Sequence, residues 1–220
     1  MTESRPSQFD QEEIRRRYDS VTRSYDAVGQ LVTLHRHDAV QALDVVPGNR
    51  ILDLACGPAV NFKRILEDLG ADGLLVGLDY VSGMLQRAHQ RVTRNQWSNV
   101  APLLGDAARL PFADCVFDRV ICTYSLNVIP LYRQALDEVS RALKPGGTLV
   151  VLDGKLGNGP ARFLNPLMRL LARGPLTDIT RPLRAELARR FQNVRTTEYD
   201  LGYAFLAVAQ RVDTEEKSQP

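Results

Sequence analysis

Three acidic residues lie where short apolar segments end, and their placement suggests a site for a nucleoside-like ligand. Asp53 begins a turn of small residues that ends at Ala59. Such a turn lets the backbone approach a ligand, and the next helix offers free N–H groups, although an ordinary strand–helix connection could look the same. Asp79 ends the next apolar segment and is suited to accept hydrogen bonds from two ribose hydroxyls. Asp106 can accept one from an adenine amino group.

The segments that carry these acids alternate between strand and helix. Short apolar runs separated by helices of about ten to fifteen residues are typical of parallel βαβ units with right-handed crossovers. The last two strands are separated only by Asp200-Leu201-Gly202 and should form an antiparallel hairpin. We therefore expect an α/β fold. The predicted strands are 50–54, 74–78, 101–104, 119–123, 148–152, 194–199 and 203–209, and the predicted helices are 14–25, 31–43, 61–69, 82–94, 131–143, 161–173 and 180–191.

The composition is that of an ordinary globular protein. The chain has 220 residues and a formal net charge of +2, so no overall field favours nucleic acid. Its three cysteines form no Cys-x-x-Cys pair, which argues against a disulfide framework and against a metal site. The first ten residues lack an apolar signal core, and no apolar run approaches the ~20 residues of a membrane-spanning helix. We expect a cytoplasmic protein.

The acidic residues belong to an ordered set of motifs that resembles the class I S-adenosylmethionine (SAM)-dependent methyltransferases. The set covers about residues 45 to 155, and the terminal hairpin also fits. The resemblance implies SAM as the cofactor and a Rossmann-like sheet of seven strands, mostly parallel with an antiparallel last strand, with helices on both faces. The matching motifs are Ile51-Leu52-Asp53-Leu54-Ala55-Cys56-Gly57, Gly77-Leu78-Asp79, Met84-Leu85, Gly105-Asp106-Ala107-x-x-Leu110-Pro111-Phe112, Phe117-Asp118 and Leu143-Lys144-Pro145-Gly146-Gly147.

The resemblance implies roles for the residues that would hold the cofactor. The turn with Asp53, Ala55 and Gly57 would hold its methionine part, and Asp79 would bind the ribose. The family usually has glycine where this chain has Ala55 and Ala59, and Ala59 should narrow the loop. The adenine would lie between two further side chains and meet an acid and an amide at its edge. These four residues are Tyr80 and Met84, then Asp106 and Ala107.

Two segments are predicted to form the methyl-transfer end of the site. In the resemblance Cys122 lies near the sulfonium, and Tyr124 is a candidate catalytic residue. Tyr18 and Tyr25 are seven residues apart and fall on one helix face, where they could be catalytic or could simply pack. Their segment is similar to quinone C-methyltransferases and to bacterial phosphatidylethanolamine N-methyltransferases, in which an N-terminal helix covers the cofactor. We expect residues 1–44 to form a helical lid, with His35 near the substrate.

The segment 154–180 is predicted to be an insertion that meets substrate or membrane. Its helix carries apolar side chains on one side and Arg162, Arg169 and Arg173 on another. Residues 160 to 195 include eight arginines and two acids, a local balance of +6. This pattern suits an anionic lipid surface at the inner face of a membrane, and the alternative is a helix packed on its own sheet. The methyltransferase domain should span 45–210, followed by a disordered tail from 211 to 220.

Two lipid acceptors fit these features. An ethanolamine amine must lose a proton before it attacks, and tyrosine hydroxyls could assist, whereas a quinol carbon needs a stronger base to deprotonate its phenolic hydroxyl. Because Tyr18 and Tyr25 are available and no carboxylate–histidine pair is evident, we favour N-methylation of phosphatidylethanolamine head groups. The alternative is C-methylation of a prenylated quinol. A soluble metabolite as acceptor, a binding protein without catalysis, and a dehydrogenase are further alternatives.

Overall fold

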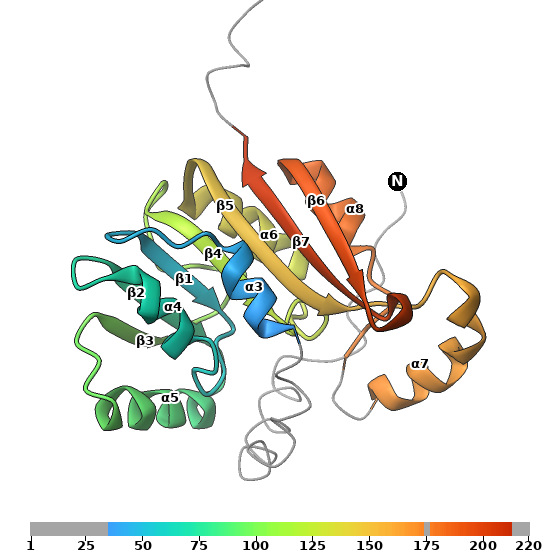
Figure 1. Ribbon diagram of the computed structural model, residues 1–220, viewed down its shortest axis with the longest axis horizontal. Coiled ribbons are helices and arrows are strands. Elements are labelled where there is room, and N and C mark those ends of the chain that lie inside the picture. Colours follow the sequence, from blue (N-terminus) through green and yellow to red (C-terminus); the bar gives the residue numbers. More distant parts are fainter. Residues whose placement is uncertain (1–34, 174–176, 213–220) are drawn as a thin grey trace, which may run out of the picture.

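The computed structural model describes residues 35–173 and 177–212, which fold around one seven-stranded sheet (Figure 1). The strand order is β3-β2-β1-β4-β5-β7-β6, and β7 is antiparallel to both of its neighbours. The Rossmann-like fold class and the terminal hairpin are therefore confirmed. The strands are β1 Arg50–Leu54, β2 Leu74–Asp79, β3 Val100–Leu104, β4 Phe117–Thr123, β5 Leu143–Gly154, β6 Phe191–Tyr199 and β7 Ala204–Arg211.

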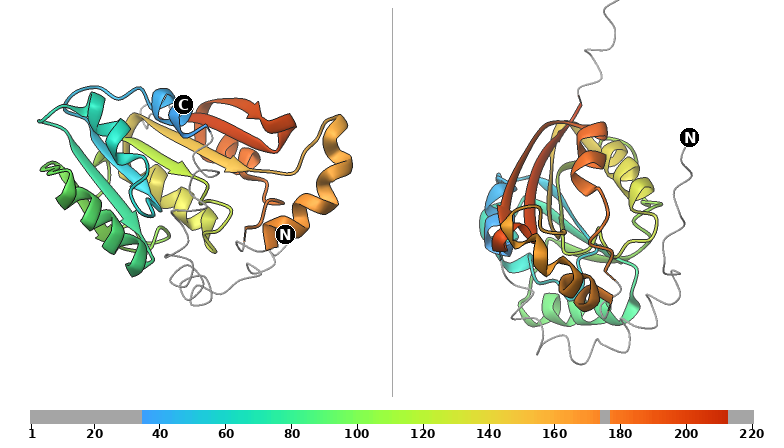
Figure 2. Two further views of the ribbon diagram at one scale, coloured as in Figure 1. Left: turned by 60° about the horizontal axis from the view of Figure 1, so that its bottom comes forward. Right: turned by 90° about the vertical axis from the view of Figure 1, so that its right-hand side faces the viewer.

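Helices cover both faces of the sheet, as expected for central strands that are apolar throughout. In β1, Ile51 belongs to the core on one face and Leu52 to the core on the other. Figures 1 and 2 show α3, α4 and α5 on one side, and α6 and α8 on the other. The helices are α3 Arg36–Ala42, α4 Phe62–Leu69, α5 Ser82–Arg94, α6 Tyr132–Ala142, α7 Asn165–Arg173 and α8 Leu183–Arg190, with short 3₁₀ helices η2 Pro160–Leu164 and η3 Asp200–Gly202.

The N-terminal part of the expected lid lies outside the described residues, and its last helix belongs to the core. In α3, Ala39 and Val40 are buried, and Leu43 just after it is fully buried. These residues pack in the same core cluster as the buried side chains of α4. The predicted catalytic tyrosines Tyr18 and Tyr25 lie outside the described residues, as do residues 213–220 of the expected tail.

Strand β5 begins earlier than the sequence predicts. Leu143 pairs with Phe117 of β4, so the Lys144-Pro145-Gly146-Gly147 motif lies inside the strand instead of between helix and strand. A register shift between Phe117 and Arg119 accommodates the motif.

None of the described helices is long and apolar enough to cross a membrane.

The loops that follow five strands lie together at one end of the sheet, the end where these strands have their carboxyl termini. The five strands are β1, β2, β3, β4 and β5. These five strands are parallel, so their carboxyl ends point the same way. In open α/β sheets of this kind, ligands bind outside the carboxyl ends of the strands. The three acids singled out in the sequence all lie at this carboxyl end of the sheet; they are Asp53, Asp79 and Asp106.

Candidate active site

A pocket lies at the carboxyl ends of β1, β2, β3 and β4. Its empty volume, counted together with the open solvent at its mouth, is about 790 Å³. Most of the lining is apolar, and among the described residues its charged members are two acids, Asp79 and Asp106. The lining residues are Ala55, Gly57, Leu78, Asp79, Tyr80, Val81, Met84, Gly105, Asp106, Ala107, Tyr124, Ser125, Val128, Ile129 and Pro130.

The loop after β1 contains three left-handed residues, and two of them, Ala55 and Gly57, line the pocket. Ala55, Gly57 and Ala59 have φ values of 54°, 55° and 64°. A side chain at Gly57 would meet nothing within 4 Å, so what favours glycine there is its backbone conformation. Ala59 does not line the pocket; it is 1% exposed and packs in the core with Phe62. The structure therefore does not support the expected narrowing of the loop by Ala59.

Asp79 joins the loop to the end of β2. Its Oδ2 accepts a hydrogen bond from the Gly57 N–H at 2.7 Å, and its Oδ1 accepts one from the Val81 N–H at 2.9 Å. Burial raises the pKa of Asp79, and these backbone donors oppose the rise. Because an ionised carboxylate has about four acceptor positions, both oxygens can still accept hydrogen bonds from a bound diol.

The residues expected around an adenine lie together in the pocket. Tyr80, Met84, Asp106 and Ala107 all line it. Tyr80 is 37% exposed and Met84 is 2% exposed, so one is open to solvent while the other lies on the core side. The Oδ1 of Asp106 accepts a hydrogen bond from the Ala108 N–H at 2.9 Å, which orders the turn after β3.

Asp53 lies beneath the loop and does not line the pocket. Its Oδ2 accepts a hydrogen bond from Asn61 Nδ2 at 3.0 Å, while its buried Oδ1 has no hydrogen-bond partner. Asn61 also contacts Arg36 and Thr123, and Arg36 donates to Thr123 as well. Burial raises the pKa of Asp53 to about 7, against the opposing effect of the Arg36 charge. Asp53 can therefore support the loop from below through Asn61.

Cys122 is not beside the pocket, which corrects its expected position. Its side chain is 1% exposed and packs in the core with Leu126. Burial raises the pKa of the Cys122 thiol well above its usual range, so it stays neutral. The residues after β4 that do line the pocket are Tyr124 and Ser125.

A carboxylate–histidine pair joins the start of α3 to η3, outside the lining of the pocket, although none was evident in the sequence. His35 Nε2 lies 3.2 Å from both carboxylate oxygens of Asp200, which is 165 residues away in the chain. The imidazole stacks on Tyr199 with ring centroids 4.0 Å apart, and its Nδ1 is 3.8 Å from Asp38. With Nε2–H directed at Asp200, Nδ1 keeps a basic lone pair. Sequence reasoning missed Asp200 because only the fold brings η3 to α3.

Tyr124 is the pocket residue whose ionisation the charge of Asp200 affects. Its ring lines the pocket, and the Arg36 guanidinium lies 5.3 Å from the ring centroid. Burial raises the pKa of Tyr124 to about 12; the Arg36 charge opposes this rise, and the Asp200 charge adds to it. At neutral pH the Tyr124 hydroxyl is therefore protonated, so it can donate a hydrogen bond and cannot act as a base.

The predicted substrate or membrane arginines lie away from the pocket. Arg162 and Arg169 are exposed on η2 and α7, and neither lines it. Arg173 ends α7, and the description of the structure does not extend to its side chain. Within the described residues, no group of three or more His, Cys, Asp or Glu side chains could hold a metal ion.

The arrangement fits the cofactor that the sequence implied. SAM combines a ribose diol, an adenine and a positively charged sulfonium. The pocket offers a carboxylate for the diol, a stretch of apolar and aromatic wall for the adenine, and acids as its charged groups, which suits a cationic ligand.

Comparison with known proteins gives matches in both sequence and fold. The sequence model of the ubiE/COQ5 methyltransferase family matches residues 7–157. A demethylmenaquinone methyltransferase of Bacillus cereus (strain ATCC 10987 / NRS 248) is 34% identical over 141 residues, which are 62% of this chain and 60% of that protein. One of Listeria monocytogenes serotype 4a is 32% identical over 155 residues, 68% of this chain and 65% of that protein. The match thus spans less than two thirds of the length of these relatives.

Solved structures share the fold at low sequence identity. A SAM-dependent methyltransferase from Aquifex aeolicus superposes with a TM-score of 0.64 at 18% identity, over 88% of this chain and 98% of that one. The cyclase SpnF superposes with a TM-score of 0.75 at 15% identity, over 92% of this chain and 96% of that one. Because one of these is named for a cyclisation, the fold alone does not determine the reaction.

Proposed function

The chain belongs to the ubiE/COQ5 methyltransferase family, and we propose that it transfers the methyl group of SAM to a ring carbon of a prenylated quinol. The relatives reported above are named for demethylmenaquinone, which supports the quinol alternative over the phosphatidylethanolamine that we favoured from sequence alone. No comparison supports phosphatidylethanolamine as the acceptor, and the tyrosines on which that preference rested lie outside the described residues.

The pocket residues take the cofactor roles that the sequence implied. Asp79 accepts hydrogen bonds from the ribose hydroxyls, and the loop with Ala55 and Gly57 lies along the methionine part. Tyr80 and Met84 flank the adenine, and Asp106 with the Ala107 amide meets its edge. These assignments are supported by the shared pocket lining and by the free acceptor positions of Asp79. When bound, SAM supplies an electrophilic methyl group on its sulfonium.

The His35–Asp200 pair is the observation that carries the quinol proposal. A quinol carbon becomes nucleophilic when its neighbouring hydroxyl loses a proton, and His35 Nδ1 can accept that proton while Nε2–H stays directed at Asp200. Asp200 stabilises the imidazolium that forms, and Tyr199 holds the ring orientation by stacking. Attack by the ring carbon would break the methyl–sulfur bond and release S-adenosylhomocysteine, and the ring carbon would then lose its hydrogen as a proton, which restores the aromatic ring.

Tyr124 has a different role from the one first expected. Because burial raises its pKa to about 12, its hydroxyl cannot take a proton from an amine at neutral pH. It can donate a hydrogen bond to the oxygen of an acceptor and so help to orient the ring. A quinol presents such an oxygen beside the reacting carbon, whereas a protonated ethanolamine amine presents only donors.

The acceptor is tested by competition between acceptors for radiolabelled methyl groups. The full chain is incubated with tritiated SAM and with vesicles that contain demethylmenaquinone, reduced or oxidised, or phosphatidylethanolamine. A soluble phenol is added as a further candidate. We expect label in the quinone fraction only after reduction, because only the quinol has an ionisable hydroxyl. Label in phosphatidylethanolamine or in the soluble phenol would overturn the proposed acceptor while leaving methyl transfer intact.

A further inference from the structure

The helix α7 and the adjoining η2 present an apolar surface that stays exposed in the described part of the chain. The large apolar residues of this surface are Phe163, Leu167, Leu170 and Leu171, with exposed fractions of 74%, 51%, 61% and 60%. They recur at helical spacing and so share one face. No described residue from 160 to 172 is buried. The alternative that we considered from the sequence, in which this helix packs on its own sheet, is therefore wrong.

This surface is held out from the domain by hydrogen bonds at its base. The Asn165 side chain accepts from the Gly157 N–H and donates to the Gly157 carbonyl, both at 3.0 Å. The Tyr203 hydroxyl donates to the Ala161 carbonyl at 2.7 Å. These bonds satisfy backbone groups at the start of the segment, so the apolar face projects from an ordered base.

The charge of residues 154–173 indicates the kind of partner that this apolar surface would bind. From residue 154 to 173 there are four cations, Lys155, Arg162, Arg169 and Arg173, and no acid. Lys155 pairs with Glu198 at 3.2 Å, whereas within residues 35–173 and 177–212 neither Arg162 nor Arg169 forms an ion pair. A short apolar helix face beside unpaired arginines suits the headgroup region of an anionic bilayer.

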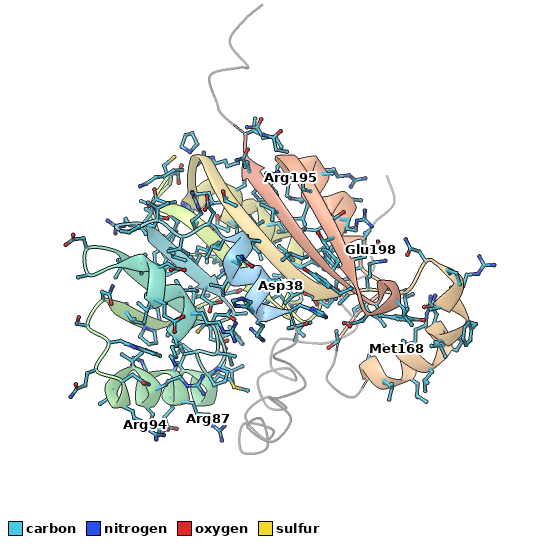
Figure 3. The ribbon with its side chains drawn as sticks, in the orientation of Figure 1. Asp38, Arg87, Arg94, Met168, Arg195 and Glu198 are labelled. Carbon is cyan, nitrogen blue, oxygen red and sulfur yellow. The ribbon has the colours of Figure 1, made fainter. Side chains whose placement is uncertain are left out.

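The position of the segment relates this surface to the pocket. The segment leaves the carboxyl end of β5, and the pocket lies at the carboxyl ends of the parallel strands β1 to β4. The segment and the pocket are therefore at the same end of the sheet, where the parallel strands have their carboxyl termini. Figure 3 shows Met168 on α7 at this end of the molecule and Arg195 on β6 toward the other end.

We propose that residues 160–173 dock the protein on an anionic lipid bilayer, with Phe163, Leu167, Leu170 and Leu171 inserted among the acyl chains near the headgroups. Arg162 and Arg169 then meet lipid phosphates. Docking would turn the end of the sheet that carries the pocket toward the membrane. This proposal concerns binding to lipid and stands whether or not the acceptor is a quinol.

Sedimentation of the full chain with vesicles tests docking without SAM or acceptor. We expect wild type to sediment with vesicles of phosphatidylcholine and phosphatidylglycerol and to remain in solution with phosphatidylcholine alone. The double variant Arg162→Glu/Arg169→Glu should lose at least about tenfold in partitioning, since each cation near an anionic surface contributes measurably. The variant Leu170→Ser/Leu171→Ser should lose a similar factor. Both should keep the wild-type melting temperature, because none of these side chains is buried.

Arg195→Glu is the matched control. It reverses one charge on an exposed residue of β6, half the change of the double variant, and should partition within about twofold of wild type, because the membrane charge acts over a Debye length. Docking through this segment is contradicted if wild type fails to sediment with anionic vesicles, if it sediments equally with neutral ones, or if Arg195→Glu loses as much as the double variant. A helix that covers another protein would give the first of these results.

Discussion

Asp79 combines two tasks at the scale of a single residue. Its oxygens accept hydrogen bonds from the Gly57 and Val81 N–H groups and so fix the shape of the loop, and their remaining acceptor positions are the ones that we propose for the ribose. The same residue could be identified from sequence, because an acid at the end of the second strand has few other uses. His35 is the opposite case, since its chemistry depends on Asp200, which is distant in sequence and adjacent only in the fold.

Replacing Asp79 with asparagine should weaken SAM binding. The amide loses the charge and one acceptor oxygen, and its NH₂ group opposes one of the two backbone donors. Hydrogen bonds to a charged group contribute about 1.5–3 kcal/mol, so we expect a loss of about 10- to 100-fold in affinity by calorimetry. Asp72→Asn, on an exposed loop, should bind SAM as wild type does. Equal affinities for the two variants would remove the ribose assignment.

Replacing His35 with glutamine should slow turnover without weakening SAM binding. General-base catalysis contributes about 10²- to 10⁴-fold, so kcat should fall by a factor in that range at neutral pH. Because phenolic hydroxyls ionise without help near pH ~10, the variant should approach the wild-type rate as the pH rises toward that value. A pH–rate profile of both proteins measures this. A variant that stays slower by a constant factor at every pH would assign His35 a structural role.

At the scale of elements, α3 is anchored by one buried cation. Arg36 is 8% exposed, donates to Asn61 Oδ1 at 3.1 Å and to Thr123, and lies against the Tyr124 ring. This contact joins α3 to α4 and to the end of β4. It also positions His35, the residue before it, beside η3. A buried polar network of this kind fixes where a helix can sit.

Arg36→Ala should destabilise the fold. Removing one partner from a buried charged network costs about 3–5 kcal/mol, because Asn61 and Thr123 lose a donor and Asp53 loses its neighbouring cation. Urea unfolding measures the difference. Arg64→Ala, the same change on an exposed residue of α4, should stay within about 0.5 kcal/mol of wild type. If both variants unfold alike, the network does not hold α3.

The sequence predicted elements well wherever a periodic pattern was decisive. The predicted bounds of β1 and α5 are those of the structure, because an apolar run and a helical repeat each end at a clear change of residue type. The start of β5 was missed, because pairing with β4 outweighs the turn-forming Lys144-Pro145-Gly146-Gly147. The sequence left the exposure of α7 open between two alternatives, since an amphipathic pattern is the same whether a helix packs on protein or on lipid.

At the scale of the whole molecule, the buried acids beneath the pocket make stability depend on pH. Burial raises the pKa of Asp53 to about 7 and that of Asp153 to about 6, from a value near 4 in the unfolded chain. The folded state therefore binds more protons than the unfolded state between about pH 4 and 7. Stability from these groups is complete below about pH 4 and is lost as the pH rises through 6 and 7.

Asp53→Asn should remove one part of this dependence. The variant cannot ionise at this position, so its melting temperature minus that of wild type should become more positive as the pH rises from about 5 to about 8. Asp153 is present in both proteins and cancels in the difference. Thermal unfolding followed by circular dichroism at several pH values measures this trend. A difference that is constant or decreases with pH would show that Asp53 is ionised across the range.

The position of the transferred methyl group tests the central claim most directly. The enzyme is incubated with SAM labelled with ¹³C in its methyl group and with reduced demethylmenaquinone, and the purified product is studied by NMR. We expect the label as a methyl group on a ring carbon of the quinol. A label on the quinol oxygen, or no labelled quinol while an amine acceptor becomes methylated, would contradict the assignment of this pocket to carbon methylation.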